Sequence, residues 1–209
     1  MICQLCINEL VAEIVTAFHK KKNEDLAFIV GIDGLSGAGK TTLVGELESQ
    51  LKNVSNVVVI HIDDYIVERN KRYNTAFEEW HEYYYLQWDV EELKQQLFNK
   101  LFRNELLLNL PFYESSLDKV IQKTISVTPN SIILIEGVFL QRKEWKPYYD
   151  YAVFIDCSRE TRYERVLERD AYIGDLQARL HKYKRRYWVA ENYYIENVDP
   201  IKIADKVYK

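Results

Sequence analysis

The chain has 209 residues, of which 47% are hydrophobic and 29% are charged, and its formal net charge at pH 7 is -4. This composition excludes a disordered or fibrous protein and predicts a single folded domain over residues 1–209. The negative net charge argues against general affinity for nucleic acid or for an anionic membrane surface. No apolar run approaches the ~20 residues of a membrane span, and the N-terminus lacks the pattern of a signal peptide. We therefore expect a cytoplasmic protein with no membrane partner.

Residues 1–23 carry apolar side chains at helical spacing, which predicts an N-terminal amphipathic helix. Cys3 and Cys6 form a C-x-x-C pair in this segment, but no second pair follows that would complete a zinc site. We expect both cysteines to be small core residues of the helix, and a metal or redox role is the alternative.

A glycine-rich stretch, GIDGLSGAGKTTL at residues 31–43, follows an apolar run at 26–30 that predicts a buried strand. Apolar residues at helical spacing come after it. Between a strand and a helix, Gly34-x-x-x-x-Gly39-Lys40-Thr41 predicts a phosphate-binding loop, because glycines let backbone N–H groups turn toward an anion. Lys40 is expected to reach the β- and γ-phosphates of ATP, and the Thr41 hydroxyl to bind Mg2+. The residues expected to bind the nucleotide here are Gly34, Ser36, Gly37, Ala38, Gly39, Lys40, Thr41 and Thr42.

Further apolar runs predict strands at 57–62, 132–135 and 151–155, and they alternate with helical patterns, one of which opens at Asp89. Such alternation predicts an α/β fold, a doubly wound parallel sheet with helices on both faces. The segment 64–89 is rich in aromatic and charged residues but has little strand signal. We interpret it as an insertion over the substrate site.

Acidic residues follow two of the predicted strands: Asp63 lies in HIDDY, and Glu136 lies in IEGVF. Ligands of such sheets bind beyond the carboxyl ends of the strands, so either carboxylate could hold the metal beside Thr41 or accept a proton from an attacking hydroxyl. A turn or helix-capping role is the alternative for each. Asp64 is the rival of Asp63, but neighbouring side chains on a strand point to opposite sides, so only one is expected to face the loop. His61 is expected to be packed or hydrogen-bonded rather than catalytic.

Three arginines follow the strand at 151–155. Arg162, Arg165 and Arg169 share one face of a helix, while Glu160, Glu164 and Glu168 lie on roughly the opposite face. This segregation predicts a row of guanidinium groups that faces polyphosphate and neutralises charge on the transferred group. A solvated helix face is the alternative.

The phosphate loop, VVVIHIDDY, LPFYE, IILIEGVFL and SRETRYERVLERD, in this order, resemble the uridine kinase and phosphoribulokinase family of small-molecule kinases, over most of residues 26–207. The resemblance implies a P-loop kinase fold with a short lid at 158–174. It implies transfer of the γ-phosphate of ATP to a hydroxyl of a ribonucleoside such as uridine or cytidine. It also implies that Asp63 is the base toward that hydroxyl and that Glu136 helps to organise Mg2+, with both near the substrate.

DDY followed later by LQWDVEEL is also similar to nicotinamide riboside kinases, in which the corresponding aspartate holds ribose hydroxyls. That similarity makes Asp89 a candidate sugar-binding residue, with an ordinary helix N-cap as the alternative. Tyr65 of DDY and Tyr113 of LPFYE are further candidate substrate contacts, and for Tyr113 core packing is an equal alternative.

The chain departs from uridine kinases at several positions. Asp64-Tyr65-Ile66 stands where the family has Ser-Phe-Tyr, and residues 115–118 lack the His and Arg that the family uses for base recognition. Phosphotransfer is therefore better supported than uridine, and nicotinamide riboside, pantothenate or another metabolite alcohol is the alternative acceptor. The sequence leaves a homo-oligomer open.

A nucleic-acid-binding NTPase is a different class of function to weigh, since HKYKRRYW at 181–188 interleaves basic and aromatic residues. The apolar and aromatic residues around it recur at intervals of four and three, which predicts the buried stripe of a helix, with the basic residues largely off it. The stripe consists of Leu176, Leu180, Tyr183, Tyr187, Ala190 and Tyr194, and the basic residues are Lys182, Lys184, Arg185 and Arg186. Buried tyrosines cannot stack on bases, so we expect no nucleic-acid partner.

Overall fold

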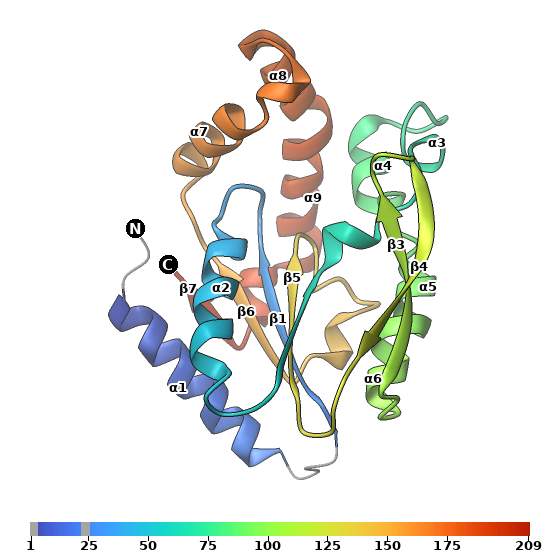
Figure 1. Cartoon of the computed structure of the whole chain (residues 1–209). Coiled ribbons are helices and arrows are strands. Elements are labelled where there is room, and N and C mark those ends of the chain that lie inside the picture. Colours follow the sequence, from blue (N-terminus) through green and yellow to red (C-terminus); the bar gives the residue numbers. More distant parts are fainter. Residues whose placement is uncertain (1–3, 22–25) are drawn as a thin grey trace.

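The computed structural model describes residues 4–21 and 26–209. Within this part of the chain, five strands form one parallel sheet in the order β2-β5-β1-β6-β7. Helices lie on both faces of the sheet (Figure 1), so the predicted doubly wound parallel sheet is confirmed. The strands are β1 (Phe28–Gly34), β2 (Val57–His61), β5 (Ile132–Gly137), β6 (Tyr151–Ile155) and β7 (Lys206–Tyr208).

Alternate residues of the central strands pack into two separate cores. Phe28, Val30 and Ile32 of β1 pack with α1 (Gln4–Lys20) and α2 (Lys40–Leu51) on one face of the sheet. Ile29 of β1 and its neighbours on β5 pack into the other core. Because each fully buried aliphatic side chain contributes roughly 1.5–3 kcal/mol, burial on both faces fixes the sheet and the loops at its edge.

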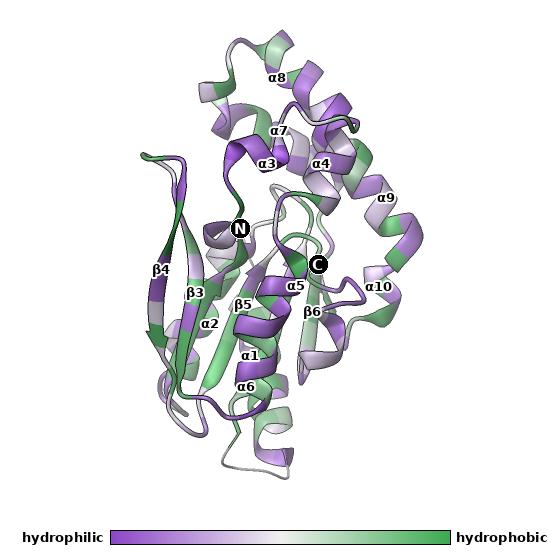
Figure 2. Ribbon diagram, turned by 90° about the vertical axis from the view of Figure 1, so that its right-hand side faces the viewer, coloured by the Kyte–Doolittle hydropathy of each residue, from purple (hydrophilic) through white to green (hydrophobic). Residues whose placement is uncertain are grey.

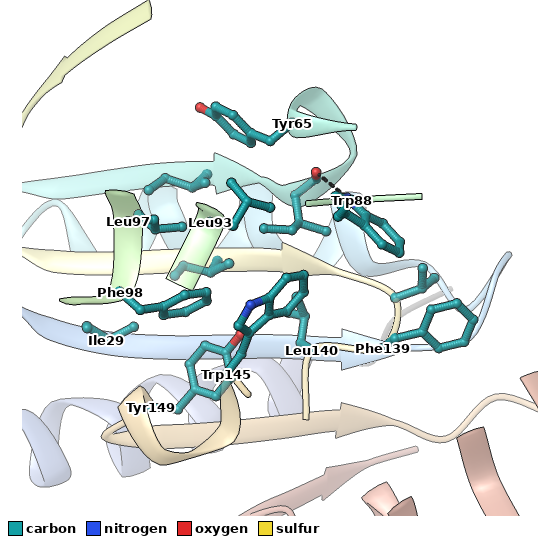
Figure 3. Packing of buried hydrophobic residues seen from close by; sticks show 14 of the residues in the cluster. Ile29, Tyr65, Trp88, Leu93, Leu97, Phe98, Phe139, Leu140, Trp145 and Tyr149 are labelled. Carbon is teal, nitrogen blue, oxygen red and sulfur yellow. Dashed lines mark hydrogen bonds between the residues drawn. The ribbon is translucent and has the colours of Figure 1, made fainter. Parts of the chain in front are cut away.

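The second core is rich in aromatic residues. Figure 3 shows Phe98, Trp145 and Tyr149 packed beside Leu93 and Leu97, and the Trp88 indole N–H donates to the Ile62 carbonyl at 2.9 Å. The helical pattern predicted from Asp89 is broken into pieces by a π-helical turn. The pieces are α5 (Val90–Leu93), the π turn Lys94–Phe98 and α6 (Asn99–Phe102).

An antiparallel hairpin, β3 (Leu107–Glu114) and β4 (Lys119–Ser126), stands apart from the main sheet. The sequence did not predict these strands. β4 exposes most of its side chains, so it lacks the buried alternating face by which a strand is recognised. The short strand β7 was not predicted either.

Several short helices lie beyond the carboxyl ends of the strands (Figure 1). One group belongs to the segment 64–89, and the other follows β6. Figure 2 shows that α3 and α7 are hydrophilic. The elements are the 3-10 turn Ile62–Tyr65, α3 (Arg69–Arg72), α4 (Glu79–Tyr85), α7 (Arg159–Arg169), α8 (Leu176–Lys182) and α9 (Trp188–Val198). The short helix α10 (Pro200–Ile203) follows α9 and leads into β7 beside the sheet.

The predicted stripe of the C-terminal helix is only partly correct. Tyr183, Ala190 and Tyr194 are buried, but Leu176 is 50% exposed and Arg186 is 0% exposed. The reason is a π-helical turn at Tyr183–Tyr187, which has one more residue per hydrogen-bonded turn than an α-helix and so shifts the side chains on either side of it.

Cys3 lies outside the described residues, and Cys6 is partly buried against the core formed by α1 and α2. Within residues 4–21 and 26–209, no helix is long and apolar enough to cross a membrane.

Candidate active site

The phosphate loop connects β1 to α2, so its backbone sits at the N-terminal, electropositive end of a 12-residue helix. Gly37 and Gly39 have φ values of 78° and 97°, a left-handed backbone that favours glycine. A Cβ on Gly37 would lie 2.7 Å from the Arg162 carbonyl oxygen and 2.9 Å from Val166 Cγ1. The loop therefore has this shape because α7 packs directly on its backbone.

The Lys40 side chain folds over the loop. Its Nζ donates to the carbonyls of Gly34 at 2.9 Å and Leu35 at 3.2 Å. Burial lowers the pKa of Lys40, although the carboxylates of Glu136 and Asp63 oppose the change. A cation on a long stem thus lies at the mouth of an anion-binding loop.

Glu136, at the end of β5, links the phosphate loop to the neighbouring strand. Its Oε1 accepts a hydrogen bond from the Thr41 hydroxyl at 3.2 Å and lies 2.7 Å from Nδ1 of His61, which pairs with Glu136 across the two strands. Burial alone would raise the pKa of Glu136, but the His61 hydrogen bond and the Lys40 charge outweigh it and lower the pKa. The hydrogen bond to Glu136 likewise raises the pKa of His61. The result is an ionised carboxylate beside a hydroxyl, both of them oxygen ligands of the kind that Mg2+ prefers.

Asp63 is placed by the 3-10 turn that follows β2. Ile62 of this turn packs against Gly137, where a Cβ would lie only 2.1 Å from Ile62 Cγ2, so the glycine after Glu136 lets the turn approach β5. Asp63 and Lys40 line the same cavity, of about 730 Å³, whereas Asp64 is not among its lining residues. Burial raises the pKa of Asp63, and Lys40 and Arg169 partly offset the effect.

The cavity has the size of a small-molecule site and three walls. Ser36, Gly37 and Lys40 form the first, and residues of the segment 64–89 form the second, among them Arg69, Arg72 and Tyr73. The third comes from the end of α7 through the start of α9, including Arg169, Lys182 and Tyr187. Most of the second and third walls was not identified from the sequence.

The three arginines of α7 that were predicted to form one row have different surroundings. Arg169 lines the cavity and pairs with Asp170 at 2.7 Å. Arg165 donates to the Gly37 carbonyl at 3.1 Å. Arg162, expected to contact the nucleotide, is buried and does not line the cavity. Of the three arginines that were predicted to face one ligand, Arg169 alone lines the cavity.

Arg162 supports the phosphate loop from behind. Its Nη1 pairs with Glu191 at 2.9 Å and donates to the Ser36 carbonyl at 3.2 Å, while the other Glu191 oxygen accepts from the Ser36 N–H at 2.8 Å. Glu191, which is 2% exposed, thus connects α9 to the loop. The sequence contains no local signal for this contact, because Ser36 and Glu191 are 155 residues apart.

Asp33, inside the glycine-rich stretch, is a second buried acid that sequence reasoning missed. It accepts hydrogen bonds from the Gly34 N–H at 2.8 Å, from the Gln141 side chain at 3.2 Å and from the Tyr194 hydroxyl. Burial raises the pKa of Asp33. The sequence does show that Asp33 directly precedes Gly34, and this position could have indicated a role in shaping the phosphate loop.

Arg186 ties the two groups of short helices together. It pairs with Glu82 at 2.9 Å, and both side chains are buried. It also donates to the Arg72 carbonyl at 3.1 Å and lies 4.1 Å from the centre of the Tyr73 ring. The expectation that Arg186 lies off the buried face is wrong, because Glu82 and the aromatic ring compensate its buried charge.

Four predicted substrate contacts are not among the residues that line the cavity. One of them is Glu136, which instead bonds to Thr41 and His61. Tyr65 is buried and packs edge-on against Phe112. Tyr113 is also buried, and its hydroxyl donates to Asp118 at 2.8 Å. Asp89 is exposed and caps α5 by accepting from the Glu92 N–H at 2.9 Å. Thr42 is exposed on the first turn of α2.

Comparisons with known proteins agree with this geometry. The uridine kinase of Lactobacillus helveticus is 29% identical to the chain over 148 residues, which cover 68% of this chain and 67% of that protein. The uridine kinase of Macrococcus caseolyticus is 32% identical over 146 residues, or 68% of each chain. The matched region thus spans about two thirds of the length of these relatives.

Solved structures match over nearly the whole chain. A possible uridine kinase from Bacillus stearothermophilus is 41% identical, with a TM-score of 0.79 and coverage of 97% of this chain and 98% of that chain. D-glycerate 3-kinase from Cryptococcus neoformans shares the fold, at 12% identity and a TM-score of 0.55, over 95% of this chain and 88% of that chain.

The phosphoribulokinase/uridine kinase family model matches residues 29–196, a region that contains the phosphate loop, Asp63, Glu136 and the arginines of α7. The chain belongs to this family, and it is a P-loop kinase, a phosphotransferase that acts on a hydroxyl group.

Proposed function

We propose that this protein transfers the γ-phosphate of ATP to a hydroxyl group of a small-molecule acceptor, with Asp63 as the general base. The single observation that carries the proposal is that Asp63 and Lys40 line one cavity. A carboxylate and a phosphate-binding cation that line one small space are what an in-line transfer needs.

The donor end of the cavity fits a magnesium-bound triphosphate. The loop N–H groups and Lys40 would bind the phosphates. Oxygen ligands for Mg2+ would come from Asp63, which lines the cavity, and from the hydrogen-bonded pair Thr41 and Glu136, which does not. The ion would neutralise charge on the phosphates during transfer.

At the acceptor end, Asp63 takes the proton of the attacking hydroxyl. The hydroxyl oxygen forms a bond to the γ-phosphorus, the bond between that phosphorus and the bridging oxygen breaks, and ADP leaves with the electron pair. Desolvation raises the pKa of Asp63, which makes it a stronger base than an aspartate with an ordinary pKa.

Two classes of acceptor are supported by different observations. A ribonucleoside such as uridine or cytidine is supported by the curated relatives, which are named uridine kinases. Another metabolite alcohol, such as nicotinamide riboside or pantothenate, is supported by residues 115–118, which lack the expected base-reading His and Arg and are not among the residues lining the cavity.

A coupled ADP-release screen tests the proposal. The purified chain with Mg-ATP should release ADP in proportion to a hydroxyl-bearing acceptor from a panel of nucleosides, ribosides and other metabolite alcohols, and the product should carry one added phosphate by mass spectrometry. ADP release that no acceptor stimulates would contradict the proposal.

The arginines of α7 give a further prediction. Arg165→Ala and Arg169→Ala should lower kcat more than they lower acceptor affinity, because contacts to the moving phosphate strengthen in the transition state. Because Arg169 lines the cavity, we expect the kcat of Arg169→Ala to fall on the order of 10²-fold. Steady-state kinetics with each variant would check this, and an unchanged kcat in both would return these arginines to a solvated surface.

A further inference from the structure

The cavity wall that faces the phosphate loop is strongly basic. Five basic and two acidic side chains line the cavity in the described part of the chain. Lys40 and Arg169 belong to the donor end, where Lys40 bonds the loop carbonyls and Arg169 pairs with Asp170. The other three, Arg69, Arg72 and Lys182, are called here the basic wall.

Within the described residues, no side chain of the basic wall forms an ion pair with a carboxylate. Arg72 is the most significant member, because it is only 5% exposed. Its Nε donates to the Val67 carbonyl at 2.7 Å, and its guanidinium carbon lies 4.8 Å and 5.2 Å from the centres of the Tyr73 and Tyr113 rings. A buried guanidinium without a carboxylate partner is costly, so a ligand anion would stabilise it.

The neighbouring acid does not serve as that partner. Asp118 accepts hydrogen bonds from the backbone N–H of Arg69 at 3.0 Å and from the Tyr113 hydroxyl at 2.8 Å. It is not among the residues that line the cavity. Its carboxylate therefore fixes the start of α3 without forming an ion pair with Arg72, which lines the cavity.

Tyr73 lies among the positive charges of this wall, and they change its pKa. Its ring lies 4.1 Å from the Arg186 guanidinium, 4.8 Å from that of Arg72 and 5.6 Å from Lys182 Nζ. Burial alone would raise the pKa of Tyr73, but the charges of Arg186, Lys182 and Arg72 outweigh it and lower the pKa. Glu82 neutralises Arg186, so the uncompensated charge belongs to Arg72 and Lys182.

The two arginines of the basic wall lie away from the donor phosphates. Figure 1 shows α3, which carries Arg69 and Arg72, across α9 from α7, which covers the phosphate loop. In an in-line transfer the reacting hydroxyl sits between the γ-phosphate and Asp63, so the rest of the acceptor extends toward the opposite wall.

We infer that the acceptor carries a carboxylate or phosphate group in addition to the hydroxyl that is phosphorylated, and that Arg72, with Arg69 and Lys182, binds this group. A guanidinium presents paired donors that match either anion. The inference rests on the proposed function and selects acidic alcohols over neutral ribonucleosides.

Matched pairs of acceptors test the inference. The carboxylate arm compares pantothenate with pantothenol and orotidine with uridine, and the phosphate arm compares glycerol 3-phosphate with glycerol. In the pair that is phosphorylated, we expect kcat/KM to be at least about 10-fold higher for the acidic member. Arg72→Met should raise the KM of that member by about 10- to 100-fold, the usual effect of losing hydrogen bonds to a charged group, with the KM for ATP changed less than about two-fold.

Two further variants serve as controls. Arg72→Lys keeps the charge but not the planar fork, so its KM should lie between those of the parent and Arg72→Met. Lys184→Met removes one exposed positive charge from the same C-terminal segment, away from the lining of the cavity, and should leave the preference for the acidic member unchanged.

Calorimetry of each pair in the presence of a non-hydrolysable ATP analogue separates the inference from the proposed function. If the acidic member binds more tightly than its neutral partner, and Arg72→Met abolishes this difference, the inference is supported even if no ADP is released. An absence of ADP release would instead contradict the kinase proposal. Phosphorylation with no preference for the acidic member, or no binding of any acidic member, would overturn the inference. If acceptors were phosphorylated with no preference for the acidic member, the kinase proposal would stand.

Discussion

Lys40→Ala is expected to lower the kcat of phosphotransfer at least on the order of 10²- to 10³-fold, to the background of the assay. The substitution removes the one lysine of the phosphate loop, whose ammonium is positioned to stabilise charge on the transferring group. Thermal melting should be nearly unchanged, because the Lys40 ammonium donates only to the carbonyls of Gly34 and Leu35, and alanine favours the first turn of α2.

Lys52→Ala is the matched control. Lys52 follows the last residue of the same helix and forms an exposed ion pair with Glu48, so its loss removes the same charge far from the loop. Its kcat should equal that of the parent. Full activity of Lys40→Ala would show that this loop is not the donor site.

The elements that the sequence predicted well are those whose signal is local. The glycine pattern at 31–43 depends on residues next to one another, and the strands at 132–135 and 151–155 are continuous apolar runs because they are buried on both faces. Predicted and observed ends of these strands differ by at most two residues.

The errors arose where tertiary contacts override a local pattern. A helical period of 3.6 residues placed Arg186 outside the core, but the π turn at Tyr183–Tyr187 turns it inward, where Glu82 compensates its charge. Glu82 lies 104 residues away in sequence, so no local pattern could reveal the pair.

The candidate site divides in the same way. Asp63 and Glu136 follow buried strands, and the ends of parallel strands meet at one edge of a sheet, so their proximity followed from topology. The basic wall and Glu191 come from segments with no periodic signal, and only the folded chain brings them to the loop and the cavity. Arg162 was predicted to bind a ligand because the sequence shows which helix face it lies on. The sequence does not show that the Glu191 carboxylate forms an ion pair with it.

Asp63→Asn is expected to separate phosphotransfer from nucleotide binding. Asparagine keeps the size and hydrogen-bonding capacity of the side chain but cannot take the proton of the acceptor hydroxyl. We expect phosphotransfer to fall on the order of 10²- to 10⁴-fold, the usual contribution of a positioned general base. Calorimetry should show nearly the parent affinity for Mg-ATP, because the loop and Lys40 are untouched and asparagine keeps an amide oxygen as a ligand for the ion.

The pH profile gives an independent readout of the same residue. Desolvation raises the pKa of Asp63 above its ordinary value, so as the pH falls this base is protonated sooner than an aspartate with an ordinary pKa. The kcat of the parent should therefore decline as pH falls through the raised pKa, and the residual activity of Asp63→Asn should lack that decline.

Asp64→Asn is the control that tests the register, because Asp64 adjoins Asp63 but is not among the residues lining the cavity. It should keep nearly the full kcat. If Asp64→Asn lost activity and Asp63→Asn kept it, the base would be the neighbouring carboxylate, and the 3-10 turn would have to present a different side chain during catalysis. If neither substitution changed turnover, proton transfer to this turn would not be part of the mechanism, and the function of the cavity as a phosphotransfer site would have to rest on the loop alone.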